Sequence, residues 1–143
     1  MSAGGGHTCA VTVGGDIYCW GDNSSGQLAE PSSTSTSSSP VLSTSGVSAT
    51  FEFVEVGSGY SCGVTASGQG WCWGFNGQGN LGDGGASPAQ RTPVQINGGY
   101  TWESVSGGLQ HTCGVNQQPD GYCWGDNDRG QLGNGSTSDF QLT

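Results

Sequence analysis

The sequence predicts an all-β protein built from three copies of one disulfide-braced hairpin. The six cysteines fall into three pairs, and the two cysteines of each pair lie 10 residues apart. The pairs recur at a spacing of 53 residues, from Cys9 to Cys62, and then of 51 residues, from Cys62 to Cys113. Periods of this length are typical of propellers, solenoids and other repeat arrays.

Each unit carries the same three short strings in the same order. The first string contains the first cysteine, the second contains the second cysteine and a tryptophan, and the third is a glycine-containing loop. The strings are HTCAV at 7–11, YCWGDN at 18–23 and GQL at 26–28; YSCGV at 60–64, WCWGFN at 71–76 and GNLG at 79–82; HTCGV at 111–115, YCWGDN at 122–127 and GQLG at 130–133.

Each unit reads as a β-hairpin. In the first, a three-residue loop at 13–15 places Cys9 opposite Cys19 and Ala10 opposite Tyr18. The same register sets a glycine opposite an aromatic ring in the other two units, and we expect that ring to pack into the slot over the glycine. The pairs are Gly63 with Trp71 and Gly114 with Tyr122, and Thr8, Ser61 and Thr112 likewise face Trp20, Trp73 and Trp124.

The register also selects the disulfides. Six cysteines allow 15 connectivities, but only one puts both members of every pair on directly opposed strand positions. Each short bridge contributes about 2–3 kcal/mol in the chain-entropy model, which offsets a thin apolar core. Disulfides at this density indicate an oxidising compartment and hence secretion. The predicted pairs are Cys9–Cys19, Cys62–Cys72 and Cys113–Cys123.

Composition and charge exclude several classes of partner. Hydrophobic residues make up only 31% of the chain, Lys and Arg together number 2, and the formal net charge is −9. This balance argues against nucleic acid, which needs cations to neutralise phosphates, and against docking on anionic membranes. No apolar run approaches a membrane span, and no apolar leader precedes the first repeat, so we expect a missing leader or an excerpt.

The repeat register sets the expected boundaries. Phe51 and Trp102 each lie 11 residues before the first cysteine of their unit, and Pro40 and Pro93 each lie 21 residues after the second. We therefore divide the chain into repeat 1 at 1–50, with a Ser/Thr-rich insertion at 31–50, repeat 2 at 51–101, and a truncated repeat 3 at 102–143. By this register the chain is cut within its own repeat at both ends.

The strings resemble the repeat of the regulator-of-chromosome-condensation family, and above all its cysteine-bearing secreted relatives. The resemblance covers nearly the whole chain apart from the tract between Leu28 and Phe51. It implies a β-propeller with four-stranded blades, about seven in a closed ring, so that three units make about three blades of a longer propeller or of an assembled fibre. The chain departs from the family pattern at Ala29, Tyr60 and Phe75.

The candidate chemical residues have structural interpretations. His7 and His111 share a repeat position with Tyr60, so we interpret them as rings that pack or hydrogen-bond rather than as zinc ligands or bases. Calcium is an alternative at the oxygen-rich turns 22–23 and 126–128, but Asp and Asn are also ordinary turn residues. The three paired tryptophans are expected in the core rather than in a carbohydrate site. We expect no cofactor, no metal and no catalytic residue.

Two features favour a glycoprotein. Asn23 and Asn134 begin N-glycosylation acceptor sequences on predicted loops. An unbroken hydroxyl run between two prolines has a mucin-like composition that suits O-glycans, although a flexible polar loop would look the same. The run consists of Ser32, Ser33, Thr34, Ser35, Thr36, Ser37, Ser38 and Ser39.

The sequence therefore favours a secreted, non-enzymatic structural or interaction module, including the subunit of a glycosylated extracellular filament. Its expected partners are proteins or copies of itself, with no nucleic acid and no membrane insertion. Unpaired blade edges would be the contacts in self-assembly. The alternative is a protein-binding inhibitor or a receptor-type propeller that acts through its loop face.

Overall fold

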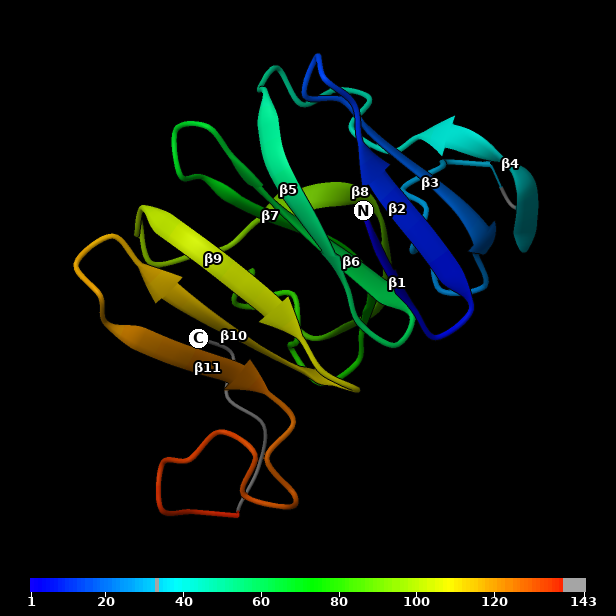
Figure 1. Ribbon diagram of the computed structural model, residues 1–143. Helices are drawn as coiled ribbons and strands as arrows, with labels where there is room; N and C mark the ends of the chain where they lie inside the picture. The colour runs from blue at the N-terminus through cyan, green and yellow to red at the C-terminus, as the bar shows by residue number, and fades with distance from the viewer. Residues whose placement is uncertain (33, 138–143) are drawn as a thin grey trace.

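The computed structural model describes residues 1–32 and 34–137, and the strands in these residues form three antiparallel sheets (Figure 1). The first sheet, blade 1, has the strand order β1-β2-β3-β4. Its strands are β1 (Ser2–Gly4), β2 (His7–Val11), β3 (Ile17–Asp22) and β4 (Thr36–Leu42). The described part of the chain contains no helix, and so no helix able to cross a membrane.

Blades 2 and 3 repeat this plan. Blade 2 has the order β5-β6-β7-β8, with β5 (Phe51–Val56), β6 (Tyr60–Thr65), β7 (Gly70–Asn76) and β8 (Ser87–Gln95). Blade 3 has three strands within the described residues, namely β9 (Trp102–Gly107), β10 (His111–Asn116) and β11 (Gly121–Gly125). The predicted all-β, propeller-type architecture with about three blades is confirmed.

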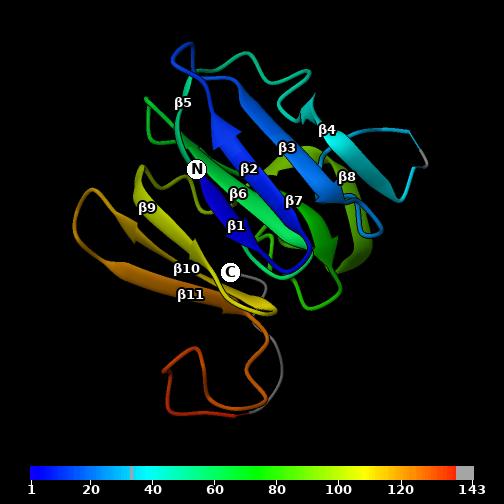
Figure 2. The same cartoon turned by 45° about the vertical axis from the view of Figure 1, so that its right-hand side comes forward.

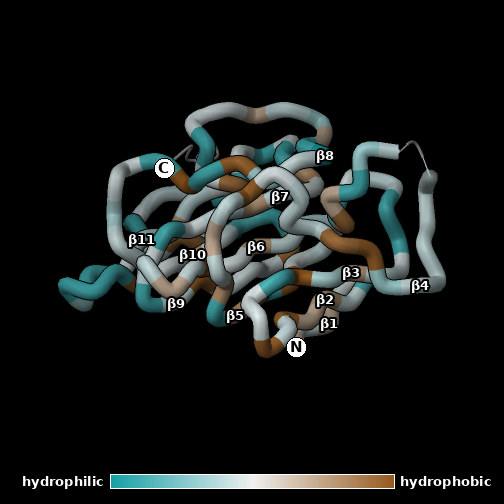
Figure 3. The backbone as a smooth tube through the Cα atoms, turned by 90° about the horizontal axis from the view of Figure 1, so that it is seen from above, coloured by the Kyte–Doolittle hydropathy of each residue, from teal (hydrophilic) through white to brown (hydrophobic). Residues whose placement is uncertain are grey.

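The blades fan out side by side, with blade 2 between the other two (Figures 1 and 2). Seen from above, β1, β5 and β9 lie along one side of the fan, and β4 and β8 lie away from it (Figure 3). Strand β5 contacts both β1 and β9, so the first strands of successive blades are neighbours. This is how blades of a propeller surround an axis.

The hairpin register predicted from the sequence is confirmed. Cys9 pairs with Cys19, Cys62 with Cys72, and Cys113 with Cys123, each across two antiparallel strands. In the same register Thr8, Ser61 and Thr112 lie opposite the three tryptophans, and the two glycines lie opposite Trp71 and Tyr122.

The slot over each glycine is filled by a different ring from the one we expected. A Cβ atom on Gly63 would lie 2.8 Å from the Phe51 ring, and one on Gly114 would lie 2.7 Å from the Trp102 ring. Phe51 and Trp102 begin β5 and β9, the neighbouring strands on the other side of the hairpin. The glycine therefore makes room for the first strand of its own blade, and not for the ring directly opposite.

The Ser/Thr-rich tract at 31–50 is wrongly described as an insertion. Residues 36–42 form β4, the outer strand of blade 1, in which Val41 pairs with Cys19. Val94 pairs with Cys72 in the same way in blade 2. The tract is a strand of ordinary blade length whose solvent-facing residues are serine and threonine, and β-propensity alone does not reveal it.

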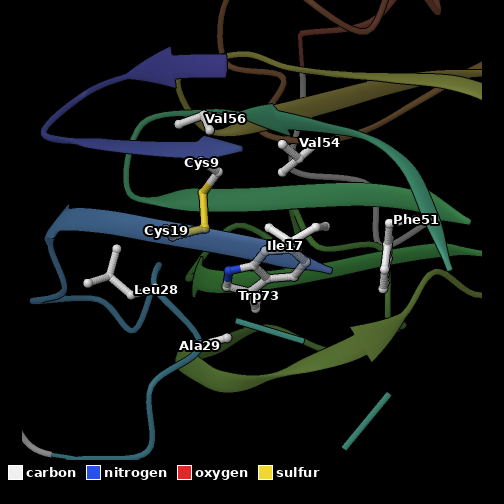
Figure 4. Close-up of a cluster of buried hydrophobic side chains, with 9 residues drawn as sticks. All are labelled: Cys9, Ile17, Cys19, Leu28, Ala29, Phe51, Val54, Val56 and Trp73. Atoms are coloured by element: carbon white, nitrogen blue, oxygen red, sulfur yellow. A yellow bond between two sulfur atoms is a disulfide. The ribbon is translucent and has the colours of Figure 1, made fainter. Parts of the chain in front are cut away.

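The core lies between the blades, and each joint has its own cluster. In the first, Ile17, Leu28 and the Cys9–Cys19 bridge of blade 1 pack on Trp73 and other apolar residues of blade 2 (Figure 4). The second cluster repeats this between blades 2 and 3. Its members are Tyr60, Cys62, Val64, Cys72, Leu81, Ile96, Trp102, Val105 and Trp124.

A glycine follows the tryptophan in every blade because a side chain does not fit there. Gly21, Gly74 and Gly125 have φ between 99° and 109°, a region that L-residues rarely adopt. A Cβ atom at each would also lie 2.4–2.6 Å from a backbone carbonyl oxygen of the paired strand. Both the conformation and the space therefore require glycine at this point of the repeat.

We expect Gly74→Ala to lower the free energy of unfolding by about 3 kcal/mol or more, because strain and backbone clash act together. Gly99→Ala is the matched control, since Gly99 also has positive φ, 66°, but nothing lies within 4 Å of its Cβ position. That variant should lose only about 1 kcal/mol. Urea unfolding of both variants measures the difference, and equal losses would contradict the proposed clash.

Candidate functional site

Every blade has two different faces. We call the face with the disulfide the trailing face and the opposite face the leading face. The trailing face carries the first ring of the repeat, the disulfide, a valine and the loop leucine. The leading face carries the Ser/Thr hydroxyl and the tryptophan indole. At both internal joints the leading face of one blade covers the trailing face of the blade before it.

At the first joint, one backbone oxygen of blade 1 holds two side chains of blade 2. The carbonyl of Gln27 accepts a hydrogen bond from Ser61 Oγ at 3.0 Å and another from Trp73 Nε1 at 2.9 Å. Gln27, Ser61 and Trp73 are all fully buried, at 0–1% exposure. Burial strengthens these bonds and makes an unpaired group costly, so the carbonyl fixes how blade 2 sits on blade 1.

The second joint has the same geometry. The carbonyl of Asn80 in blade 2 accepts from Thr112 Oγ1 at 2.7 Å and from Trp124 Nε1 at 3.1 Å in blade 3. The loop side chain differs, since Asn80 stands where blade 1 has Gln27, but the acceptor is the backbone and is unchanged. The contact therefore depends on loop geometry and not on loop identity.

An aromatic or imidazole ring completes each joint. Ser61 gives its only hydroxyl proton to Gln27, so His7 Nε2, 2.8 Å from Ser61 Oγ, must be the donor in that pair. In the next joint the Tyr60 hydroxyl takes this place, 2.9 Å from Thr112 Oγ1, and donates to the carbonyl of His111 at 2.5 Å. The structural interpretation of this ring position therefore holds for His7.

Burial keeps both rings uncharged. It lowers the pKa of His7 from 6.5 to about 4, against the opposing effect of the Asp22 carboxylate. The second ring nitrogen of His7, Nδ1, is buried without a partner among the described residues, so a proton there would find no acceptor. Burial also raises the pKa of Tyr60 to about 12, although the Thr112 hydroxyl opposes it.

The loop that presents the carbonyl is held by its own polar side chains. In blade 1, Asp22 Oδ2 accepts from Gln27 Nε2 at 2.7 Å, and Asn23 Oδ1 accepts from Leu28 N at 3.1 Å. In blade 3, Asp126 and Asn127 make the same two bonds to Gln131 and Leu132, at 2.9 and 3.1 Å. The oxygens considered for calcium are thus occupied by turn hydrogen bonds.

Two faces of the described molecule are not covered by a blade. The leading face of blade 1 presents Thr8 and Trp20, which are half-buried, whereas the equivalent residues at the joints are 0–2% exposed. The trailing face of blade 3 presents Val115, which is 37% exposed, and the half-buried Cys113–Cys123 bridge. These open faces are the candidate interaction surfaces.

All six cysteines are in disulfides, and the bonds join the pairs that the repeat selects. Among residues 1–32 and 34–137, no group of three or more His, Cys, Asp or Glu side chains is placed to hold a metal ion. His7 and His111 lie in different blades, at equivalent ends of their hairpins. The structure therefore separates the two histidines and uses every thiol for a bridge.

The prediction of an N-glycan at Asn23 needs correction. Its side chain is fully buried, and its amide nitrogen donates to the carbonyl of Thr34 at 3.0 Å. Because a glycan would be attached to that nitrogen, it would break the loop that forms the joint. Asn76 and Asn127 occupy the equivalent buried positions, so Asn23 is a structural residue of the repeat.

The other predicted modification positions are on the surface. Asn134 is exposed. Most hydroxyl residues between 32 and 39 are also exposed, and Ser33 lies outside the described residues. The structure gathers this run on the outer strand of blade 1 and the loop before it, away from both joints.

Comparison with known proteins agrees with this architecture. The family model described as "Regulator of chromosome condensation (RCC1) repeat" matches residues 1–27. The chain is 33% identical over 136 residues to the human E3 ubiquitin-protein ligase HERC2, an alignment that covers 92% of this chain. That alignment covers 3% of HERC2, so the chain corresponds to a small part of this relative.

Solved structures show the same fold. Prp20p from Saccharomyces cerevisiae, a structure reported with its binding properties to Gsp1p and histones, superimposes with a TM-score of 0.87 at 20% identity. The ectodomain of the Physcomitrella patens receptor kinase CR4 gives a TM-score of 0.55 at 26% identity. The matches cover 99% and 88% of this chain, and 36% and 29% of the respective neighbours.

We expect the protein to lose stability as the pH falls from about 6.5 to about 4, because the unfolded chain then takes up a proton that folded His7 refuses. Above pH 6.5 this contribution is complete, and it is on the order of 2 kcal/mol. His7→Tyr, which copies the second blade, should remove this part of the pH dependence. Chemical unfolding of both proteins across this range tests it, and identical slopes would rule out His7 as the source.

The Cys113–Cys123 bridge should be reduced first under native conditions, because it is half-exposed whereas the other bridges are at most 1% exposed. Brief treatment with limiting reductant, then alkylation and peptide mapping, should label Cys113 and Cys123 before the others. Uniform labelling of all three pairs would contradict the protection of the joints.

Proposed function

The chain is built of regulator of chromosome condensation (RCC1) repeats, and we propose that it is a non-catalytic protein-interaction module of an extracellular protein. The observation that carries this proposal is the disulfide at the same register in each of the three blades. A thiol pair in one blade could be incidental. Three equivalent pairs, each at the face where blades meet, favour a fold made for an oxidising compartment.

The similarity to a receptor ectodomain supports the same location. At 26% identity, the CR4 ectodomain is an example of this fold on the outside of a cell. The net charge of −9 also favours protein partners over nucleic acid and anionic membranes. The activity in the name of HERC2 does not transfer, since the match covers 3% of that protein.

The chemically versatile side chains already have structural uses, which supports a role without catalysis. The cysteines are bridged, and His7 donates across a blade joint. Asp22 and Asp126 hold the loops that present the joint carbonyls. A nucleophile needs a nearby base that is free to accept its proton, and these groups are committed elsewhere.

We extend the proposal to glycans on the exposed polar surface. Asn134 and the exposed hydroxyl residues of the 32–39 run are accessible and lie outside the joints. A carbohydrate there would extend into solvent without disturbing blade packing. Asn23 is left out because its amide belongs to the buried loop.

A receptor-type or inhibitor-type propeller that binds through its loops is the second candidate. The likeness to the CR4 receptor ectodomain favours it. The two candidates differ in where the partner binds, because the first uses the open blade faces and the second the hairpin loops. Both place the chain outside the cell.

The proposal is tested on protein from its natural source by denaturing, non-reducing alkylation followed by peptide mapping. We expect no alkylated cysteine in the six positions, and added mass on peptides that contain Asn134 or the 32–39 run. Recombinant protein reduced before alkylation is the control and should label all six. Six labelled thiols in the native material would overturn the extracellular assignment, and unmodified peptides would overturn the glycans alone.

A further inference from the structure

We infer that the open leading face of blade 1 binds the open trailing face of blade 3 of a second copy, so that the chain assembles head to tail. The inference rests on the interaction function proposed above and names its partner. It follows from the two internal joints, which show what covers each kind of face. The two open faces are the two halves of a third joint of the same design.

The leading face of blade 1 holds the donor half. Thr8 and Trp20 occupy the repeat positions at which Ser61 and Trp73 donate to Gln27. Within the described residues, neither the Thr8 hydroxyl nor the Trp20 indole N–H has a protein acceptor. Both are half-buried and stand beside a hollow lined by Ala3, Gly4, Gly5, Gly6, His7, Thr8, Trp20 and Gly21.

This hollow has room for a loop backbone. At the internal joints, the Cβ positions of Gly74 and Gly125 lie 3.1 and 3.2 Å from the Cα atoms of Gln27 and Asn80. The loop of one blade therefore rests on the glycine of the next. Gly21 is the equivalent glycine in blade 1, and it lines the hollow without a loop upon it.

The trailing end of blade 3 holds the acceptor half, already folded. The loop hydrogen bonds from Gln131 to Asp126 and from Leu132 to Asn127 match those of blade 1, where the loop is engaged. The carbonyl of Gln131 is thus presented as the carbonyl of Gln27 is. A preformed loop loses little conformational entropy on binding, which favours association.

The apolar parts of the two faces also match the internal joints. Val64, equivalent to Val115, is 1% exposed in the joint between blades 2 and 3. Burial of Val115 and the Cys113–Cys123 bridge would remove a similar apolar surface from water. His111 stands at the edge, where His7 donates to the hydroxyl of Ser61 in the first joint.

Each copy carries a net charge of −9, so copies repel one another at long range. The contact itself is made of neutral groups, namely a hydroxyl, an indole, a carbonyl and a valine. We therefore expect added salt to strengthen association by screening the repulsion. An assembly held by ion pairs would respond in the opposite sense.

Sedimentation velocity of the full chain over a range of concentrations tests the inference. The wild-type protein should form species that grow with concentration and with salt. Thr8→Glu blocks the leading face and Val115→Glu blocks the trailing face, so each variant alone should be a monomer. A mixture of the two should give a 1:1 dimer that does not extend, because only one pair of intact faces remains.

Val13→Glu is the matched control, since it adds the same charge at the fully exposed tip of the β2–β3 hairpin and should assemble like wild type. Near-ultraviolet circular dichroism and intact disulfides verify that each variant is folded. Thr8→Val combined with Trp20→Phe removes only the two donors and should weaken association roughly thirtyfold.

A monomeric wild-type protein at every concentration would overturn the inference, as would a mixture that stays monomeric. Self-association of Val115→Glu alone would also overturn it, because it would mean that leading faces bind each other. These results leave the extracellular interaction function standing if the native cysteines are paired, so the two proposals fail separately.

Discussion

One buried backbone oxygen in each loop determines how successive blades fit together. The carbonyls of Gln27 and Asn80 each accept a hydroxyl and an indole from the next blade, in a place without competing water. The rest of the repeat serves this contact. The aspartate and asparagine shape the loop, the glycine after the tryptophan admits it, and the leucine anchors it in the core.

This arrangement explains how a chain with 31% hydrophobic residues folds into blades. A single sheet has two faces to cover, and apolar residues are too few to build a core around each blade separately. The chain concentrates them in two shared clusters, one per joint, where a disulfide replaces part of the missing apolar volume. Repeat proteins of this kind gain stability mainly at the interfaces between neighbours.

The sequence predicted those features that depend on side-chain identity and spacing. The strand register, the cysteine pairs and the core tryptophans follow from a pattern present three times. The joint itself could not be predicted, because its acceptor is a main-chain carbonyl and any residue has one. The burial of Asn23 was missed for a related reason, since an acceptor sequence for glycans does not reveal that the amide is needed inside a loop. Strand β4 escaped because serine and threonine on an exposed strand resemble a linker.

A contact that repeats within a chain can also act between chains. The internal joints are heterologous, with a donor face on one side and an acceptor face on the other, and such contacts give closed rings or open filaments according to the rotation between units. Edge-to-edge pairing, which the sequence alone suggests, needs only exposed strand backbone and has little selectivity. Face-to-face stacking instead requires a Ser/Thr hydroxyl, a tryptophan indole, a glycine and a shaped loop at the same time. A surface of that kind selects another copy of this repeat over unrelated strands, and so the geometry that orders three blades in one molecule also specifies which partner can continue the series.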